Sequence, residues 1–421
     1  MKLHIDIDCF FASAHRINNP KLYNIPIAVG GRSNLNIFDR KKQTRKISSI
    51  EGAFTSSILS SNDDMTCDEY FRDSDGRYRG IITTSSYEAR KFGVKTAMSV
   101  AEALRYCPHL TLIPPNYPLY HELSHKFKLL LEKEIPTIEQ FSIDEFFCDV
   151  SGWIKDEDIL SFARKLKLQI LSQIGLPVSI GIAKTKWIAK LATEDAKPFG
   201  IKLVLPDEVE GYIKDIPIHK FPGIGEGYSE RLLGRGVKTL GDVKEKKELF
   251  YSWGKNGVQL YNRINGIDNE KLQISSSKKS IGLGRTFDNE DNRDEIKRRI
   301  TILARHITFL ALKGNHTPLT YSLQIRYKYG EKSHDYINTN RLFNEQYFKQ
   351  ELLKLFSKID IHPSHSIIQI NITISNFSET KYNTLDLFHY EEDTMKSKLT
   401  QSMQKLRDKF GIDIIKSGGE L

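Results

Sequence analysis

The chain has 421 residues, of which 39% are apolar and 27% charged, and 62 Lys and Arg against 53 Asp and Glu give a formal net charge of +9. At about 100–200 residues per domain, this length predicts two to four domains. No run of about 18 apolar residues occurs and the N-terminus has no long apolar segment, so we expect neither a membrane span nor a secretory signal. The four cysteines lie too far apart for a metal-binding knuckle, which excludes a disulfide framework and a zinc finger and fits a reducing compartment. The modest positive charge permits a polyanionic partner without demonstrating one.

The first 200 residues alternate between strand and helix patterns. Residues 2–8 alternate apolar and polar side chains, which predicts a strand with one buried face. Further strands are expected at 25–29, 81–84, 110–113, 140–150 and 178–182. A helical stretch containing residues 87–90 is expected, with further helices at 100–106, 120–133, 159–173 and 186–193. Strands and helices mixed in this order predict an α+β or split βαβ layout.

Residues 32–79 break this pattern with 48 residues rich in Ser, Asp, Asn, Lys and Arg. We interpret them as an insertion or mobile loop outside the core. A second unit is marked by Pro222-Gly223-Ile224-Gly225 between helical segments, and a third begins near Ser275, with a helix at 294–312 and strands at 320–329 and 367–374. Residues 271–335 hold 13 basic against 7 acidic residues, so this stretch carries +6 of the net charge.

Three carboxylates stand out because they occur among apolar residues. Asp6 lies near the end of the first strand, and Asp144 and Glu145 lie between Ile143 and Phe146. Buried carboxylates are costly unless a cation neutralises them, and oxygen donors suit Mg²⁺. Each acid alone is also explained as a solvated strand-end residue. Neighbours in a strand face opposite sides, so joint use of Asp144 and Glu145 requires the strand to bend or end there. Asp8 shares a face with Asp6, and spacing does not choose between them.

Several polar residues have the chemistry to hold phosphates. Tyr87 and Arg90 share one helical face, and Lys197 precedes a proline; each is also explained as an ordinary surface residue. Gly223 and Gly225 allow backbone amides to approach a phosphate at the start of the next helix.

Together and in this order, these segments resemble the Y-family, translesion DNA polymerases, in particular their DNA polymerase IV-like branch. The matching segments cover most of residues 1–290: 4–12 (HIDIDCFFA), 87–94 (YEARKFGV), 142–145 (SIDE), 181–183 (GIA) with Lys184, Lys186 and Lys190 behind it, 196–198 (AKP), 222–225 (PGIG) and 279–282 (KSIG). The resemblance selects Asp6 over Asp8.

The resemblance implies a site and a reaction. Two Mg²⁺ ions would be held by Asp6, Asp144, Glu145 and the main-chain carbonyl of Ile7. The reaction would be low-fidelity, template-directed transfer from dNTPs to a primer 3′-hydroxyl, with lesion bypass and no proofreading, since we find no second acidic set for an exonuclease. The nucleotide would contact Cys9, Phe10, Phe11, Tyr87, Arg90 and Lys197, with Phe11 as the steric gate against a 2′-hydroxyl.

The resemblance also implies a right-hand architecture. A ferredoxin-like palm would comprise 1–10 and 116–205, small fingers 11–115, a helical thumb with a helix-hairpin-helix 206–275, and an α/β little finger 280–380. Gly223, Gly225, Lys297, Arg298 and Arg299 are the expected DNA contacts, although the three basic residues also fit a solvated helical face.

The tail, 381–421, contains Leu385, Leu387 and Phe388, which look like a peptide that docks on the sliding clamp, although Thr384 stands where the usual Gln would be. Behind this peptide, Met395, Leu399, Met403, Leu406 and Phe410 recur at helical spacing. We interpret them as a packing helix in preference to a partner-binding one.

Primer-template DNA, dNTPs and a sliding clamp are the expected partners of a monomer in the bacterial cytoplasm, at the nucleoid. Two alternatives remain open. A non-catalytic DNA-binding scaffold in DNA repair would need no buried acids, and another palm-based nucleotidyl enzyme such as a cyclase would leave the Pro-Gly-Ile-Gly segment unexplained.

Overall fold

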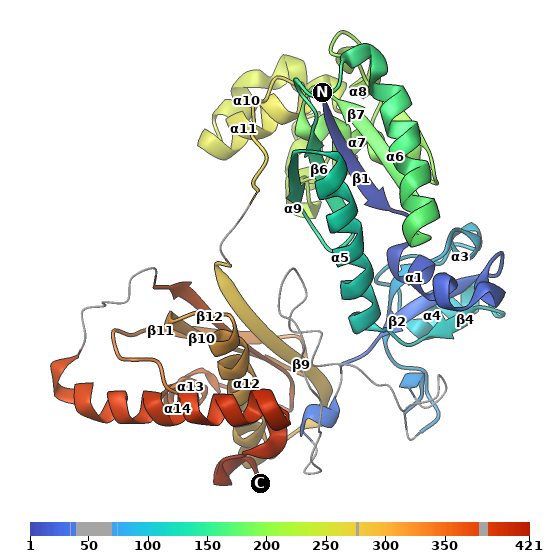
Figure 1. Cartoon of the computed structure of the whole chain (residues 1–421). Helices are drawn as coiled ribbons and strands as arrows, with labels where there is room; N and C mark the ends of the chain where they lie inside the picture. The colour runs from blue at the N-terminus through green and yellow to red at the C-terminus, as the bar shows by residue number, and fades with distance from the viewer. Residues whose placement is uncertain (34, 39–69, 74, 275–277, 379–385) are drawn as a thin grey trace. The chain divides into compact units, whose positions relative to one another are not determined.

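The computed structural model describes residues 1–33, 35–38, 70–73, 75–274, 278–378 and 386–421. The chain forms two compact units, Met1–Gly31 with Met65–Ser276 and Arg32–Asp64 with Ser277–Leu421 (Figure 1). Among the helices in the described ranges, none combines the length and the apolar character needed to cross a membrane.

The first unit is built on a five-stranded sheet with the order β5-β6-β1-β7-β8. Its strands are β1 (Lys2–Ile7), β5 (Thr137–Gln140), β6 (Glu145–Asp149), β7 (Val178–Ala183) and β8 (Ile201–Leu203). Helices α5 (Tyr117–Glu134) and α6 (Ile159–Ile174) share an apolar core with one face of this sheet, and α7 (Lys186–Ala196) packs on the other (Figure 1). The central strand β1 is antiparallel to both neighbours.

The prediction that β1 buries only one face is wrong, because all six of its residues are buried. Leu3, Ile5 and Ile7 belong to the core beneath α5 and α6. On the other face the ring of His4 contacts α7, where its Nδ1 lies 2.9 Å from Thr193 Oγ1. Because β1 is covered on both faces, its second face is buried as well, and a polar residue such as His4 is tolerated there when it is hydrogen-bonded.

The predicted strand at 140–150 is two strands, because β5 ends at Gln140 and β6 begins at Glu145. Asp144 therefore lies in the turn before β6, and the requirement that the strand bend or end at the acidic pair is met because β6 begins at Glu145. On the far side of β1, Gly181 in β7 lies directly under α7. A Cβ added there would lie 2.0 Å from the carbonyl oxygen of Ala189, so only glycine permits this approach of helix and strand.

A smaller sheet follows β1 in the same unit, with the order β3-β2-β4. Its strands are β2 (Ile27–Gly31), β3 (Ile81–Ser85) and β4 (Thr111–Ile113), and its helices are α1 (Phe10–Asn18), α3 (Tyr87–Lys91) and α4 (Val100–Tyr106), with the short η1 (Pro20–Leu22) after α1. The helical elements that end the unit are α8 (Val209–Ile213), η5 (Ile218–Lys220), α9 (Glu226–Leu233), η6 (Gly241–Lys246), α10 (Lys247–Tyr251) and α11 (Gly254–Ile264). Their apolar cluster continues into α7 through Ile188.

The interpretation of 32–79 as lying wholly outside the core is wrong at its two described ends. Ile37 and Phe38, in the short helix η2 (Leu35–Phe38), are buried in the core of the second unit. Tyr70 and Phe71 are buried in the first unit, in the core beside the small sheet. These apolar pairs are short within a polar stretch, so composition alone hides them. Residues 39–69, the middle of the predicted insertion, lie outside the described residues.

The second unit has a four-stranded antiparallel sheet with the order β11-β10-β12-β9. Its strands are β9 (Ser280–Glu290), β10 (Pro318–Tyr327), β11 (Lys332–Asn338) and β12 (Ile367–Phe377), and helices α12 (Arg293–Lys313) and α13 (Glu345–Ile359) share its apolar core. The predicted helix and both predicted strands are confirmed. Alternate residues such as Ser322, Gln324 and Thr373 point away from α12 and α13, so the sheet face opposite these helices is polar.

Helix α14 (Tyr390–Phe410) does not pack as its sequence pattern predicts. Met395, Leu399, Leu406 and Phe410 are exposed, by 44–68%. The buried side is polar: Asp393 accepts two hydrogen bonds from Arg341 at 2.7 and 2.8 Å, and Arg407 pairs with Glu345 of α13. Ion pairs therefore dock this helix on the second unit, and hydrophobic periodicity cannot detect them.

The C-terminal residues complete a buried ion-pair cluster in the second unit. Glu420 pairs with Arg305 of α12 at 2.6 Å and with Lys349 of α13 at 2.7 Å. Burial raises the pKa of Glu420, but the charges of Arg305 and Lys349 outweigh it and lower that pKa to about 2. The ionised carboxylate thus fastens the last turn, η9 (Gly418–Glu420), which follows η8 (Ile412–Ile414).

We expect Glu420→Gln to lower the free energy of unfolding at pH 7 by about 3 kcal/mol, because it leaves buried cations without their partner. A carboxylate with a depressed pKa stabilises the fold above its unfolded value, 4.5, and loses this contribution as pH falls toward about 2. The difference in the free energy of unfolding between wild type and variant, measured by urea unfolding, should therefore become smaller from pH 5 to pH 3. Glu391→Gln, on the exposed side of α14, is the control; equal losses in both variants would contradict the prediction.

Candidate active site

Three acids from distant parts of the chain meet at one end of the five-stranded sheet. Asp6, near the end of β1, lies opposite Glu145, the first residue of β6, in the antiparallel register. Asp144 is placed by the Ile7 amide, which donates to its carbonyl oxygen at 3.0 Å, and by Ser142 Oγ, which donates to its carboxylate. The chain folds this way because the tight turn before β6 returns the acidic pair to the end of β1.

The electrostatics of these acids are unfavourable without cations. Burial, together with the charges of Asp144 and Glu145, raises the pKa of Asp6 to about 8 despite the nearby Lys197. Burial likewise raises the pKa of Asp144, and Glu145 adds to the effect. Two lysines supply the counter-charge: Lys197 Nζ lies 3.0 Å from Asp6 Oδ2, and Lys190 pairs with Glu145 Oε1.

These residues fit a divalent metal centre. Of the hydrogen bonds made by the described residues, none from a side chain reaches Asp6 Oδ1, Asp144 Oδ2 or Glu145 Oε2. The lysines hold only one oxygen each, on long side chains that can move aside. An all-oxygen donor set suits a hard cation such as Mg²⁺.

Asp8 has a different environment from Asp6, although both follow the same alternation. Its carboxylate accepts from Ser179 Oγ at 2.9 and 3.1 Å, from the Phe199 amide at 2.7 Å and from the Tyr87 hydroxyl at 3.2 Å. Burial raises the pKa of Asp8, while these donors oppose the rise. Protein donors thus already surround Asp8, and its role here is to fix Tyr87 and the chain before Gly200.

The side chains predicted to hold the triphosphate lie in this same unit. Burial and Asp8 raise the pKa of Tyr87, so its hydroxyl stays protonated and donates. The Arg90 guanidinium lies over the Tyr87 ring at 4.9 Å, and its Nε donates to the Ser85 carbonyl at 3.1 Å. Lys197 bridges Asp6 and Glu194. Tyr87 therefore contacts Asp8, which follows β1, and Lys197 contacts Asp6 within β1.

The first turn of α1 places the two predicted pocket phenylalanines differently. Phe10 is buried in the core. Phe11 is partly exposed, and its ring stacks on Tyr120 of α5 with centroids 4.0 Å apart and planes 7° from parallel. Cys9, before the helix, has a left-handed backbone with φ of 47°. Contact of these residues with a nucleotide stays a prediction.

The predicted DNA contacts fall into two kinds of place. Gly223 and Gly225 are exposed before α9, with nothing within 4 Å of either Cβ position, so the backbone there is open to a ligand. On α12, Arg299 pairs with Glu290 and Glu295, both at 2.8 Å, and Arg298 pairs with Glu295 at 2.7 Å. Lys297 is more exposed and pairs with Asp294. These ion pairs give the three basic residues of α12 a structural role. That they contact DNA stays a prediction.

Of the predicted clamp peptide, only part falls in the described residues. Leu385 and the side chain of Leu387 are outside them. Phe388 is 98% exposed in the short turn η7 (Leu387–His389). Its exposure leaves the ring accessible.

Sequence reasoning missed several residues that shape this site. The sequence places Lys190 in a family motif but does not identify it as the counter-ion of Glu145. The i, i+4 spacing of Lys186 and Lys190 on α7 indicates that the two lysines share one helical face. Lys186 itself pairs with Glu139 at 2.7 Å in a buried site, so spacing does not say which lysine faces the acids. Ser142 and Ser179 gave no signal, since isolated serines are common.

Comparisons with known proteins identify the family of this chain. A family model described as the impB/mucB/samB family matches residues 5–194. DNA polymerase IV of Oceanobacillus iheyensis is 32% identical over an alignment of 427 residues, covering 98% of this chain and 90% of that protein. DNA polymerase IV of Pasteurella multocida is 30% identical over 334 residues, covering 78% and 81%.

Solved structures show the same fold at lower identity. A Y-family DNA polymerase chimera of Dbh and Dpo4 aligns with a TM-score of 0.70 and 21% identity, over 89% of this chain and 98% of that one. An insertion ternary complex of Dbh DNA polymerase aligns over the same shares with a TM-score of 0.58 and 22% identity. The predicted α+β multidomain polymerase fold is therefore confirmed.

The fold and the curated relatives are those of a DNA-directed DNA polymerase. The chain belongs to the Y-family, translesion DNA polymerases, in the branch of DNA polymerase IV. The predicted family and enzyme class are confirmed.

Proposed function

We propose that this polymerase transfers nucleotides from dNTPs to a primer 3′-hydroxyl under the direction of a template, with two Mg²⁺ ions held by Asp6, Asp144, Glu145 and the Ile7 carbonyl. The observation that carries the proposal is the convergence of the buried Asp6, whose pKa is raised, with the partly buried Asp144 and Glu145. When bound, the ions lower the pKa of the primer hydroxyl and neutralise charge on the triphosphate.

The protein's own residues position the reactants. Tyr87, Arg90 and Lys197 bind the triphosphate: the hydroxyl donates one hydrogen bond, the guanidinium holds two oxygens, and Lys197 turns from Asp6 toward phosphate. In-line attack at the α-phosphorus then depends chiefly on positioning and charge stabilisation. The three groups are supported by their contacts beside β1.

Sugar selection and fidelity follow from the pocket around α1. Phe11, held against Tyr120, excludes a 2′-hydroxyl, and Cys9 and Phe10 complete the pocket wall. We propose that synthesis is of low fidelity, proceeds past damaged template bases and has no proofreading step. The relatives named DNA polymerase IV support this reading.

The remaining proposals concern domains and partners. The palm would comprise 1–10 and 116–205, the fingers 11–115, the thumb 206–275 and the little finger 280–380. Primer-template DNA would contact Gly223 and Gly225 before α9. In the second unit it would contact Lys297, Arg298 and Arg299 of α12. Leu385, Leu387 and the exposed Phe388 would bind a sliding clamp. We propose a monomer that works at the bacterial nucleoid, in the cytoplasm.

Primer extension on undamaged and abasic templates, with and without Mg²⁺, tests the proposal. We expect Mg²⁺-dependent extension on both templates, with added nucleotides opposite the abasic site. Full-affinity DNA binding without incorporation would overturn it in favour of a non-catalytic scaffold.

A further inference from the structure

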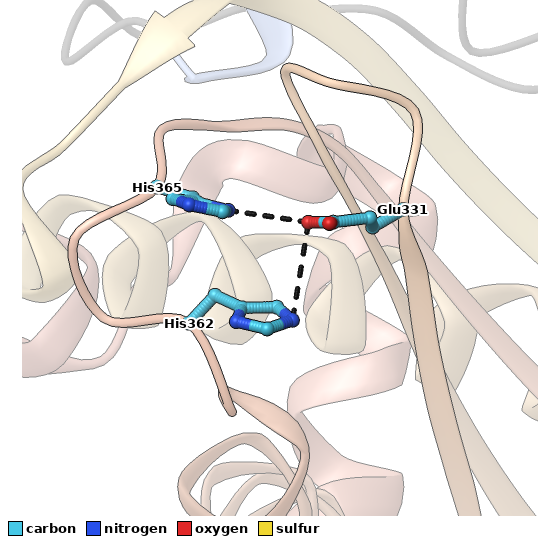
Figure 2. A group of neighbouring side chains, drawn as sticks. All are labelled: Glu331, His362 and His365. Atoms are coloured by element: carbon cyan, nitrogen blue, oxygen red, sulfur yellow. Dashed lines mark hydrogen bonds and ion pairs between the residues drawn. The ribbon is translucent and has the colours of Figure 1, made fainter.

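Two histidines and one glutamate gather at one edge of the second unit, and none of the three has a role in the assignments above. Glu331 lies in the turn between β10 and β11, and His362 and His365 lie between α13 and β12. Figure 2 shows both imidazole rings directed at the Glu331 carboxylate. His365 Nδ1 lies 3.2 Å from Glu331 Oε2, and His362 Nε2 lies 3.9 Å from the same oxygen. One ligand atom from each residue falls within 4.8 Å of the others.

The backbone around these side chains is fixed by hydrogen bonds. Arg293 of α12 donates through one nitrogen to the carbonyls of His362 and His365, at 3.0 and 2.9 Å, and it pairs with Asp360 at 2.8 Å. The turn is closed by the Tyr327 amide, which donates to the Glu331 carbonyl at 2.9 Å. The donors are therefore presented by ordered segments, which reduces the entropy lost when a ligand binds.

The two segments are also joined to each other. The Lys328 amide donates to the Ser366 carbonyl at 2.9 Å, and the edge of Tyr327 packs against both imidazoles, with centroids 5.3 and 6.0 Å away. The separation of the three donors is thus set by main-chain and ring contacts.

Two imidazoles and one carboxylate are a donor set for a borderline transition-metal ion, whereas Mg²⁺ and Ca²⁺ prefer oxygen alone. Donors about 2.1 Å from a tetrahedral centre are roughly 3.4 Å apart. The two nitrogen-to-oxygen distances, 3.2 and 3.9 Å, bracket that value. The side chains are 32–50% exposed, so an ion can enter and water can fill the fourth position.

We propose that Glu331, His362 and His365 bind one Zn²⁺ ion, through Oε2, Nε2 and Nδ1. The site differs in chemistry from the all-oxygen carboxylates beside β1. A bound ion would join the β10–β11 turn to the segment before β12, and so stabilise the second unit.

Zinc titration of the full-length protein by calorimetry tests the proposal, with His362→Ala/His365→Ala as the test variant. His334→Ala removes another exposed histidine from the same unit and is the matched control. We expect one-to-one binding in the wild type and the control, with affinity at least about 100-fold weaker in the double variant.

Thermal unfolding separates this site from the polymerase carboxylates. Zinc in large excess over its dissociation constant should raise the unfolding temperature of the wild type and of Asp144→Asn by roughly 5 °C, and leave the double variant unshifted. Binding of equal affinity in the wild type and the double variant would overturn the proposal, as would no binding to the wild type. Loss of binding in Asp144→Asn alone would place the ion at the carboxylates and also overturn it.

Discussion

Glu145→Gln and Asp6→Asn are each expected to reduce Mg²⁺-dependent primer extension by roughly 100- to 1000-fold. Each change removes one negative charge from a cluster whose remaining oxygens are needed to hold the ions, and a single electrostatic group in such a site is worth roughly 100- to 1000-fold. Both amides are nearly isosteric with the acids they replace. The measurement is single-turnover incorporation of one dNTP at saturating DNA.

Glu194→Gln is the matched control for Asp6→Asn. Lys197 pairs with both acids, at 2.8 Å from Glu194 and 3.0 Å from Asp6. If loss of a Lys197 partner were the cause of inactivity, both variants would lose activity equally. We expect the Glu194 variant to stay within about threefold of wild type, because exposed ion pairs contribute little. Extension that persists in both Asp6→Asn and Glu145→Gln would refute the assigned metal site.

The sequence was sufficient for those parts of the fold that hydrophobic patterning controls. The strand that carries Asp6 follows from alternation, and the strand that carries Glu145 follows from an apolar and aromatic run. Joint use of the two adjacent acids required a bend or an end at that pair, but the turn between Gln140 and Glu145 was not predicted. The meeting of Asp6 with Glu145 did not follow from the pattern, since strand register depends on pairing between distant segments. Only the resemblance to a family supplied it.

The packing of helix α14 was not predicted, because ion pairs hold this helix in place. Helix α14 has an apolar stripe that predicts packing, yet Asp393 and Arg407 anchor its polar side to Arg341 and Glu345. The energy of a specific ion pair depends on a partner from another element, which one sequence does not reveal. The same reason hid the pairing of Lys190 with Glu145.

Phe11→Ala is expected to raise incorporation of ribonucleotides relative to deoxyribonucleotides by about 100-fold. The Phe11 ring is held flat against Tyr120 with centroids 4.0 Å apart, so it cannot easily tilt away from an added 2′-hydroxyl. Removing the ring leaves space for that oxygen, and discrimination by shape against one hydroxyl is worth roughly 100-fold. The measurement is kcat/KM for rNTP and dNTP of the same base.

Phe11→Tyr separates the loss of bulk from a general disturbance of α1. It keeps the ring and its stacking on Tyr120, so sugar discrimination should stay close to wild type. Phe11→Ala also removes a packing contact and should cost about 2–3 kcal/mol of stability; retained dNTP incorporation shows that the variant is folded. Unchanged sugar selection in a folded Phe11→Ala protein would remove Phe11 from the gate and leave Cys9 or the backbone before α1 as the group that faces the sugar.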